Sequence, residues 1–213
     1  MKTKTAKLIV GVLVVAVMLT LGTGSVVNAA AGITGSAHDL SASGWTGGEI
    51  CIVCHTPHNA STTVSDAPLW NHTVNTTTTY TTYTSTTMTA TVGTPAGVSK
   101  LCLSCHDGTT AIDSFGGATG SHNITGAALL GTDLSNDHPI SFTYDTTLAG
   151  NDHGLYDPAV KTSGLGGTVA ADMLSGGKVE CSSCHDVHNS TGLTHLLVKA
   201  NTASALCLTC HNK

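Results

Sequence analysis

All eight cysteines of the chain fall in four copies of the pattern C-x-x-C-H. The copies span Cys51–His55, Cys102–His106, Cys181–His185 and Cys207–His211. Two cysteines at this spacing can form thioether bonds to the two vinyl groups of one porphyrin, while the adjacent histidine ligates its iron. The pattern therefore predicts four covalently bound haem c groups, one at each motif. The expected attachment residues are Cys51, Cys54, Cys102, Cys105, Cys181, Cys184, Cys207 and Cys210, with His55, His106, His185 and His211 as iron ligands.

Cysteine pairs two residues apart also occur in zinc sites, thioredoxin-like redox sites and disulfides. Those chemistries place no demand on the residue that follows the second cysteine. Here all four pairs are followed directly by histidine. The pattern therefore favours haem attachment over the alternatives.

The first 30 residues have the pattern of a secretory signal peptide. Lys2, Lys4 and Lys7 form a charged start, residues 8–21 an apolar core, and Val27–Ala29 a small-residue cleavage site. A retained membrane anchor is the alternative, but the apolar run is short for a membrane span. We expect cleavage, no membrane span in the mature chain, and a secreted protein that is extracellular, at the cell surface or periplasmic. Export agrees with covalent haem attachment, which takes place on exported chains.

The composition offers little material for an ordinary hydrophobic core. The chain has two Phe, two Trp and four Tyr against 24 Gly. A porphyrin presents a planar apolar surface larger than the ~150–250 Å² of one aromatic side chain. We therefore expect the fold class of a multihaem cytochrome c with a haem-packed core. The polypeptide should be mostly coil, with short helices at the haem motifs and a few short strands.

The charge balance limits the possible partners. The chain has no arginine, acidic residues outnumber lysines by 13 to 8, and three of those lysines lie in the signal. Haem propionates would make the mature protein more acidic still. Binding to nucleic acid or to an anionic membrane surface is therefore disfavoured. We expect most propionates to face water or to accept hydrogen bonds from Ser, Thr and backbone amides.

An internal repeat divides the mature chain. Residues 51–59 and 181–189 both read C-x-x-C-H-x-x-H-N, and residues 101–106 and 206–211 both read L-C-x-x-C-H. The repeat predicts a first diheme unit over residues 31–107 and a second over residues 136–213, joined by a glycine-rich connector over residues 108–135. The small polar segment 32–48 is expected to be an extended arm or loop, and the threonine-rich segment 73–94 a surface hairpin or an irregular loop.

Histidines outside the motifs are candidates for the second axial position of each iron. His58 and His188 each follow a motif histidine by three residues, so we expect each to reach the second haem of its own unit. The repeat then makes His38 and His138 the ligands of the first haem in each unit, with His72 in reserve. For any one of these histidines, the alternative is a surface residue in a loop. That alternative is favoured for His122, His153 and His195.

These residues together resemble a known family. The runs that carry the resemblance are H-D-L-S at 38–41, C-H-T-P-H-N-A at 54–60, P-L-W-N-H at 68–72, L-S-C-H-D-G at 103–108, L-S-N-D-H-P-I-S at 134–141, and the second pair of motifs. The chain resembles the secreted multihaem cytochromes with paired C-x-x-C-H motifs, and more closely the filament-forming tetrahaem cytochromes of the OmcE type. The resemblance implies an unbroken stack of bis-histidine haems and head-to-tail assembly of copies of the chain into an extracellular conductive filament. In such assemblies one haem can take a histidine from the adjoining subunit, and we hypothesise that His38 is that donor.

The leading functional interpretation is an electron-transfer protein rather than an enzyme. Its partners would be other copies of itself and either redox proteins or extracellular acceptors. A monomeric periplasmic electron shuttle is one alternative. A haem reductase for nitrite or a sulfur oxyanion is another, but it needs an iron with a vacant face. The surplus of histidine and the absence of arginine, the usual clamp for an oxyanion, argue against a reductase. A zinc-binding structural protein is a more distant alternative.

Overall fold

Irregular backbone makes up most of the protein. The structure is a computed structural model and describes residues 32–65 and 67–213. The signal segment expected over residues 1–30 lies outside the described residues. The α-helices are α1 (Gly97–His106), α2 (Thr146–Asp152), α3 (Val169–Asp172) and α4 (Cys207–Cys210). The 3-10 helices are η1 (Ser41–Ser43), η2 (Gly126–Ala128), η3 (Cys181–Ser183), η4 (Thr194–Leu196) and η5 (Thr202–Ser204). The prediction of mostly coil with a few short helices and strands is confirmed.

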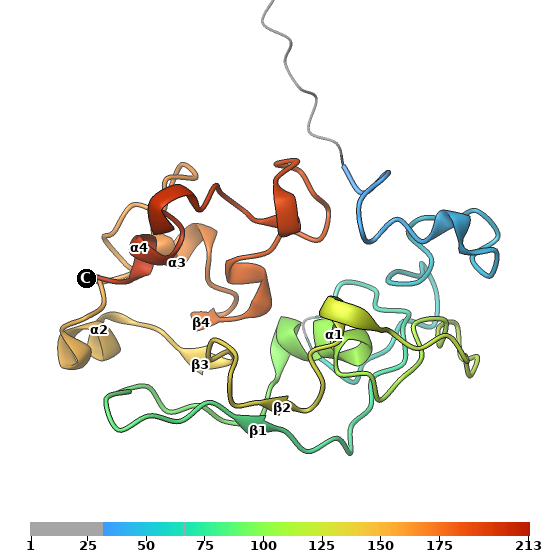
Figure 1. Ribbon diagram of the computed structural model, residues 1–213, viewed down its shortest axis with the longest axis horizontal. Helices are drawn as coiled ribbons and strands as arrows, with labels where there is room; N and C mark the ends of the chain where they lie inside the picture. The colour runs from blue at the N-terminus through green and yellow to red at the C-terminus, as the bar shows by residue number, and fades with distance from the viewer. Residues whose placement is uncertain (1–31, 66) are drawn as a thin grey trace, which may run out of the picture.

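Two small sheets tie together segments that lie far apart in the sequence. Strands β1 (Thr81–Thr82) and β2 (Asp133–Leu134) pair in parallel, whereas β3 (Phe142–Thr143) and β4 (Lys178–Val179) pair antiparallel. The threonine-rich segment therefore forms no local hairpin around β1, because β1 pairs with a strand from the connector. Figure 1 shows the early residues on the right, the C-terminus on the left, and α1 and the two sheets between them.

Helix α1 is the longest helix in the part of the chain that the structure describes, and it carries the second motif. Leu101 and Leu103 are buried on it. Its N-cap, Ala96, has no side chain that could accept a hydrogen bond from the first free N–H groups. The carboxylate of Glu180 takes that place and accepts from the backbone N–H of Ser99 at 3.3 Å. After the C-cap Asp107, Gly108 adopts a φ of 73°, a left-handed conformation that suits glycine and ends the helix.

Two short helices, α2 and α3, lie between the connector and the third motif. Asp145 caps α2 by accepting from the N–H of Leu148 at 2.8 Å, and Thr168 caps α3 by accepting from the N–H of Ala171 at 3.3 Å. Each helix is too brief for an apolar repeat to be visible in the sequence. A capping side chain before each one is the signal that could have located them.

A small aliphatic and aromatic core lies in the second half of the chain. It contains Phe142, Tyr144, Leu148, Ala149, Val169, Met173, Val179 and Leu206. Cys184 and Cys210, which belong to the third and fourth motifs, pack against it. The protein therefore has a modest core of its own, which the count of aromatic residues did not predict. The core forms because β3, β4, α2 and α3 each contribute at least one apolar side chain, and residues beside these elements add Tyr144, Met173 and Leu206.

The N-terminal segment 32–48 folds back on the rest of the protein and does not extend from it. Trp45 lies against Phe115 and stacks on His122, with ring centroids 6.0 and 5.9 Å apart. Asn189 holds the start of the segment by donating to the carbonyl of Gly32 at 3.0 Å. These contacts correct the expectation of an extended arm, although the backbone is indeed a loop.

Candidate haem-binding sites

Each motif forms one helical turn, which brings its two cysteines and its histidine to one side. The second motif lies in α1, and the other three close with a hydrogen bond from the histidine N–H to the carbonyl of the first cysteine. These bonds measure 2.8 Å at His55, 3.0 Å at His185 and 3.0 Å at His211. Residues three and four apart share a face of a helical turn. The local backbone therefore presents two thiols and an imidazole together, as covalent attachment of a porphyrin requires.

Three of the four motif histidines are oriented by a hydrogen bond from the ring to the backbone. Nδ1 of His55 lies 2.7 Å from the carbonyl of Pro68, that of His106 2.7 Å from Ala128, and that of His185 2.9 Å from His195. A carbonyl can only accept, so Nδ1 carries the proton and Nε2 keeps its lone pair. This is the arrangement by which proteins fix the tautomer of a metal-ligating histidine. Sequence reasoning missed these carbonyl groups, because nothing in a residue type marks a backbone acceptor.

Three motif histidines face a histidine from elsewhere in the chain. The ring centroids are 6.2 Å apart for His55 and His188, 6.0 Å for His106 and His38, and 6.2 Å for His211 and His138. A metal–imidazole bond is about 2 Å long, taking the value for zinc, so two such bonds plus the half-widths of two rings span roughly 6 Å. The residues present therefore fit an iron held between two imidazoles in each of these three pairs.

The pairs differ from those expected from the repeat. His188 lies opposite His55, in the other half of the chain, and not beside the second motif of its own unit. His38 faces His106 and His138 faces His211, so each lies opposite the second motif of its half and not the first. The repeat identified the four candidates but not their positions, because the fold brings the third motif against the first.

The position of His38 also bears on assembly. Burial, followed by the nearby rings of His106, His185 and His188, lowers the pKa of His38. Its imidazole is therefore favoured in the neutral form that can ligate a metal. His38 is only partly buried, but its ring already faces that of His106 in the same chain, so the structure gives no support to the hypothesis that His38 serves a neighbouring subunit.

His185 and His58 are left over from this pairing. Among residues 32–65 and 67–213, no histidine ring faces that of His185 as in the three pairs. The side chain of His58 is exposed, and its backbone is held in a turn by Thr56, whose Oγ1 donates to the carbonyl of His58 at 2.8 Å. Among the described residues, the motif histidine His185 and the candidate ligand His58 therefore do not form a facing pair within one chain.

His72, the reserve candidate, is a structural residue. Only 1% of it is exposed, and both of its ring nitrogens have partners. Nδ1 lies 3.1 Å from Oγ of Ser104, and Nε2 lies 2.9 Å from the carbonyl of Ala111. Burial lowers the pKa of His72, although the hydrogen bond to the Ala111 carbonyl opposes this shift. Neither nitrogen is free to approach a metal, so His72 joins the second motif to the loop that follows it.

The three remaining histidines lie at the surface, as the sequence indicated. His122 pairs with Asp113, with 2.6 Å between Nδ1 and Oδ2. His153 ends α2 in a left-handed conformation with a φ of 57°. His195 orients His185 through its backbone carbonyl rather than through its ring.

Cysteines of successive motifs lie close to one another. The thiols of Cys102 and Cys181 hydrogen-bond to each other, and this bond, with burial, raises the pKa of Cys102. Burial, followed by the neighbouring thiol of Cys54, raises the pKa of Cys105 to about 12. Burial, followed by Cys207, raises the pKa of Cys184. The fold therefore brings the attachment point of each motif next to that of the following one.

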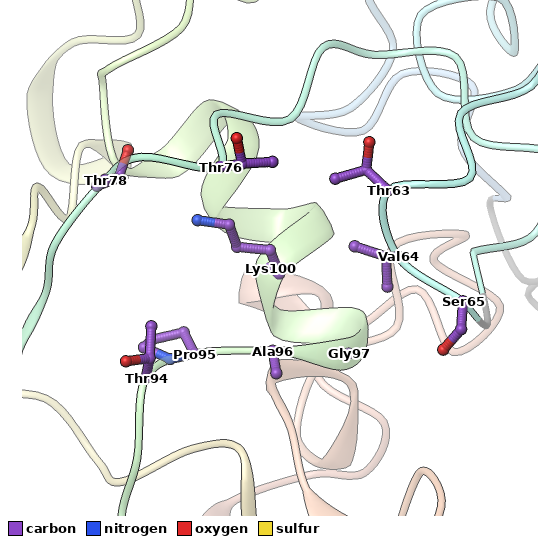
Figure 2. A pocket seen from close by; sticks show the side chains of 10 residues that line it. All are labelled: Thr63, Val64, Ser65, Thr76, Thr78, Thr94, Pro95, Ala96, Gly97 and Lys100. Atoms are coloured by element: carbon purple, nitrogen blue, oxygen red, sulfur yellow. The ribbon is translucent and has the colours of Figure 1, made fainter.

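A cavity of about 370 Å³ lies beside α1, and half of the residues that line it carry hydroxyl groups. Figure 2 shows Lys100 extending from α1 toward the segment that carries Thr76 and Thr78 and away from Thr63. An ammonium group among threonine hydroxyls can bind a carboxylate. The ammonium group of Lys100 already lies 3.3 Å from the hydroxyl of Tyr80, and the expectation that hydroxyl groups accommodate haem propionates stays a prediction.

Comparison with known proteins supports the interpretation of the motifs. Residues 174–213 match the family model described as a doubled CXXCH motif. No curated protein matches the chain. The match supports a multihaem c-type cytochrome that binds haem c covalently and takes part in electron transfer. Proteins with such motifs are typically extracytoplasmic. In the described part of the chain, no helix is both long and apolar enough to cross a membrane.

Proposed function

We propose that the protein is a tetrahaem cytochrome c that carries electrons along a stack of bis-histidine haems. The observation that carries this proposal is the set of three histidine pairs with ring centroids 6.0–6.2 Å apart, each containing a motif histidine. When bound, the haems supply reversible one-electron exchange, and the protein fixes their spacing and tunes their potentials. The closeness of successive motifs supports short distances between neighbouring porphyrins.

The role of the chain's own residues is to hold and orient. Carbonyl groups of Pro68, Ala128 and His195 fix the rings of three motif histidines. Iron held by two imidazoles has no open position for a substrate. The arrangement therefore favours electron transfer over reduction of a small molecule.

We further propose that the protein is a subunit of an extracellular filament, with His58 of one copy facing His185 of the next. His188, three residues after the third motif's histidine, faces the first motif at His55. By the internal repeat, His58 stands three residues after the first motif's histidine and would face the third motif. His58 is exposed on the surface of its own chain, so a second copy can reach it. This assigns to His58 the donor role first considered for His38.

The test is the variant His58→Ala in the secreted, haem-loaded protein. We expect a loss of filaments by electron microscopy and the appearance of one iron per chain that binds carbon monoxide. His153→Asn is the matched control, because it alters an exposed histidine in a left-handed turn that asparagine also adopts. Filaments with all irons low-spin in the His58→Ala variant would refute the subunit contact. A wild-type protein that stays monomeric would favour the electron shuttle, and a wild-type filament that binds carbon monoxide rapidly would favour the reductase.

A further inference from the structure

Glu180 is a buried carboxylate in the middle of the molecule. Only 3% of it is exposed. Its Oε2 accepts hydrogen bonds from the hydroxyl and the backbone N–H of Ser99, and from the hydroxyl of Ser141 at 2.9 Å. All three partners are donors, which fits the ionised form. Within the part of the chain that the structure describes, no lysine forms an ion pair with it.

These hydrogen bonds join two haem-attachment motifs. Ser99 lies in α1, three residues before Cys102, and its hydroxyl also accepts from the backbone N–H of Cys181 at 3.0 Å. Glu180 itself directly precedes Cys181, and its backbone N–H donates to Ser183 at 3.0 Å. The thiols of Cys102 and Cys181 meet beside this cluster. A single side chain thus fixes the second motif relative to the third.

A buried charge at this point also has an electrostatic consequence. A negative charge in a low-dielectric interior is weakly screened and acts on nearby redox centres. It favours the oxidised, more positive state of an iron centre and so lowers its reduction potential. The attachment points of the second and third haems adjoin Glu180, whereas the fourth motif is held by Tyr156, whose N–H donates to the carbonyl of Cys210 at 2.8 Å.

We propose that Glu180 is a positioning residue that locks the second and third motifs together and lowers the reduction potentials of the two haems they hold. The proposal rests on the proposed function, because it requires haems at those motifs. It adds a specific prediction: the four haems differ in reduction potential, and the two haems beside Glu180 have the lower potentials.

The main test is Glu180→Gln, which keeps the size and one acceptor oxygen of the side chain but removes its charge. Spectroelectrochemical titration should show an upward shift in the midpoint potentials that is largest for two of the four haems, those at the second and third motifs. The matched control is Glu49→Gln, because Glu49 is the other glutamate of the chain, also precedes a motif, and is exposed. Its charge is screened by solvent, so all four potentials should stay in place. Unchanged potentials in Glu180→Gln, or equal shifts in the two variants, would overturn the proposal.

A second variant separates charge from packing. Ser141→Ala removes one hydrogen bond to the carboxylate and leaves the charge in place. It should weaken the exciton couplet that coupled haems give in the Soret circular dichroism, without raising any potential. If Glu180→Gln gave no haem-loaded protein, an unchanged couplet in Ser141→Ala would overturn the proposal, and a weakened one would support it.

The number of haems per chain distinguishes a failure of the proposed function from a failure of the role of Glu180. A wild-type protein without haem at the second and third motifs contradicts the proposed function itself. Four haems per chain with unchanged potentials in Glu180→Gln contradict only the role of Glu180.

Discussion

The two halves of the molecule hold their first motifs in the same way. In each half the motif histidine forms an isolated antiparallel bridge with a residue further along, His55 with Trp70 and His185 with Leu197. Asn59 and Asn189 both adopt left-handed conformations, with φ values of 56° and 54°. Asparagine tolerates this conformation better than most residues. The repeat in the sequence is therefore a repeat of backbone path.

The halves differ in the residue that supports the second motif. In the first half, His72 contacts the hydroxyl of Ser104. In the second half, the hydroxyl of Thr209 occupies the equivalent motif position and contacts Nζ of Lys199 at 2.9 Å. The two hydroxyls are held alike, since Ser104 donates to the carbonyl of Leu101 and Thr209 to that of Ala205. A buried imidazole in one half thus stands where an ammonium group stands in the other, so the same scaffold gives two haems different electrostatic surroundings.

The halves also differ in what holds them together. The aliphatic core cluster lies entirely within residues 142–206. The first half has buried side chains, such as Val53 and Leu103, but the core cluster includes none of its residues. Ala90 and Val92 of the first half pack against that cluster, and under the proposed function porphyrin would cover much of the remaining apolar surface. The comparison suggests that the second half is stabilised by its own core as well as by haem, and the first half chiefly by haem.

The strongest test of that difference removes one haem from each half. The double variant Cys51→Ala with Cys54→Ala should make residues 51–130 sensitive to protease, because little else covers their apolar side chains. The double variant Cys207→Ala with Cys210→Ala should leave the core cluster resistant. Limited proteolysis followed by mass spectrometry measures both. Equal resistance of the two halves in both variants would contradict the comparison.

Truncation within the core cluster should be the next largest effect. Met173 is 4% exposed, and Met173→Ala should destabilise the protein by roughly 2–4 kcal/mol, because it leaves a cavity among packed side chains. Denaturant unfolding measures the change. Val160 is 73% exposed, so Val160→Ala should stay within about 0.5 kcal/mol of the unmodified protein. If Met173→Ala were equally neutral, the core cluster would not stabilise the second half.

The contrast between His72 and Lys199 predicts a change in one haem only. Lys199→Met removes the positive charge but keeps most of the length of the side chain. The reduction potential of the fourth haem should fall, because a nearby cation favours the reduced state. Lys100→Met, in the first half, is the control and should leave the fourth haem unaffected. Redox titration resolved by haem would show this, and identical titrations for the two variants would remove the proposed asymmetry.

The smallest expected effect concerns pH. Burial tends to raise the pKa of Asp113. Hydrogen bonds from His122 and from the backbone of residues 121 and 122 outweigh burial and lower this pKa to about 2. A lowered carboxyl pKa stabilises the fold at pH values above the unfolded pKa of about 4, and this contribution is lost as the pH falls from about 4 to 2. Asp113→Asn should therefore reduce the dependence of stability on pH in that window. Acid titrations of the two proteins that run parallel would contradict this prediction.

The spacing of residues within each motif predicted the local geometry of the candidate haem sites. The spacing of Cys51, Cys54 and His55 already implies one helical turn with three groups on a face. The pairing of His188 with His55 could not be predicted, because it depends on how the mostly irregular chain from residue 56 to residue 187 returns to the first motif. His72 was considered as a ligand because residue type alone cannot distinguish a buried, doubly hydrogen-bonded imidazole from a free one.

The sequence carries a signal for the importance of Glu180, namely its position next to a motif. The chain has only two glutamates, and each stands just before a motif. Whether such a charge is screened or enclosed depends on tertiary contacts with Ser99 and Ser141 from distant segments. The core cluster was missed for a related reason, since its members are spread over residues 142–206, partly in β3, β4, α2 and α3 and partly beside these elements.

The central claim is that iron porphyrins are covalently bound at all four motifs. A reduced pyridine haemochrome spectrum of the purified secreted protein, set against its amino-acid content, measures this directly. The account predicts four haem c groups per chain. A value near zero would contradict the claim altogether, and a value of two would show that only half of the motifs carry haem.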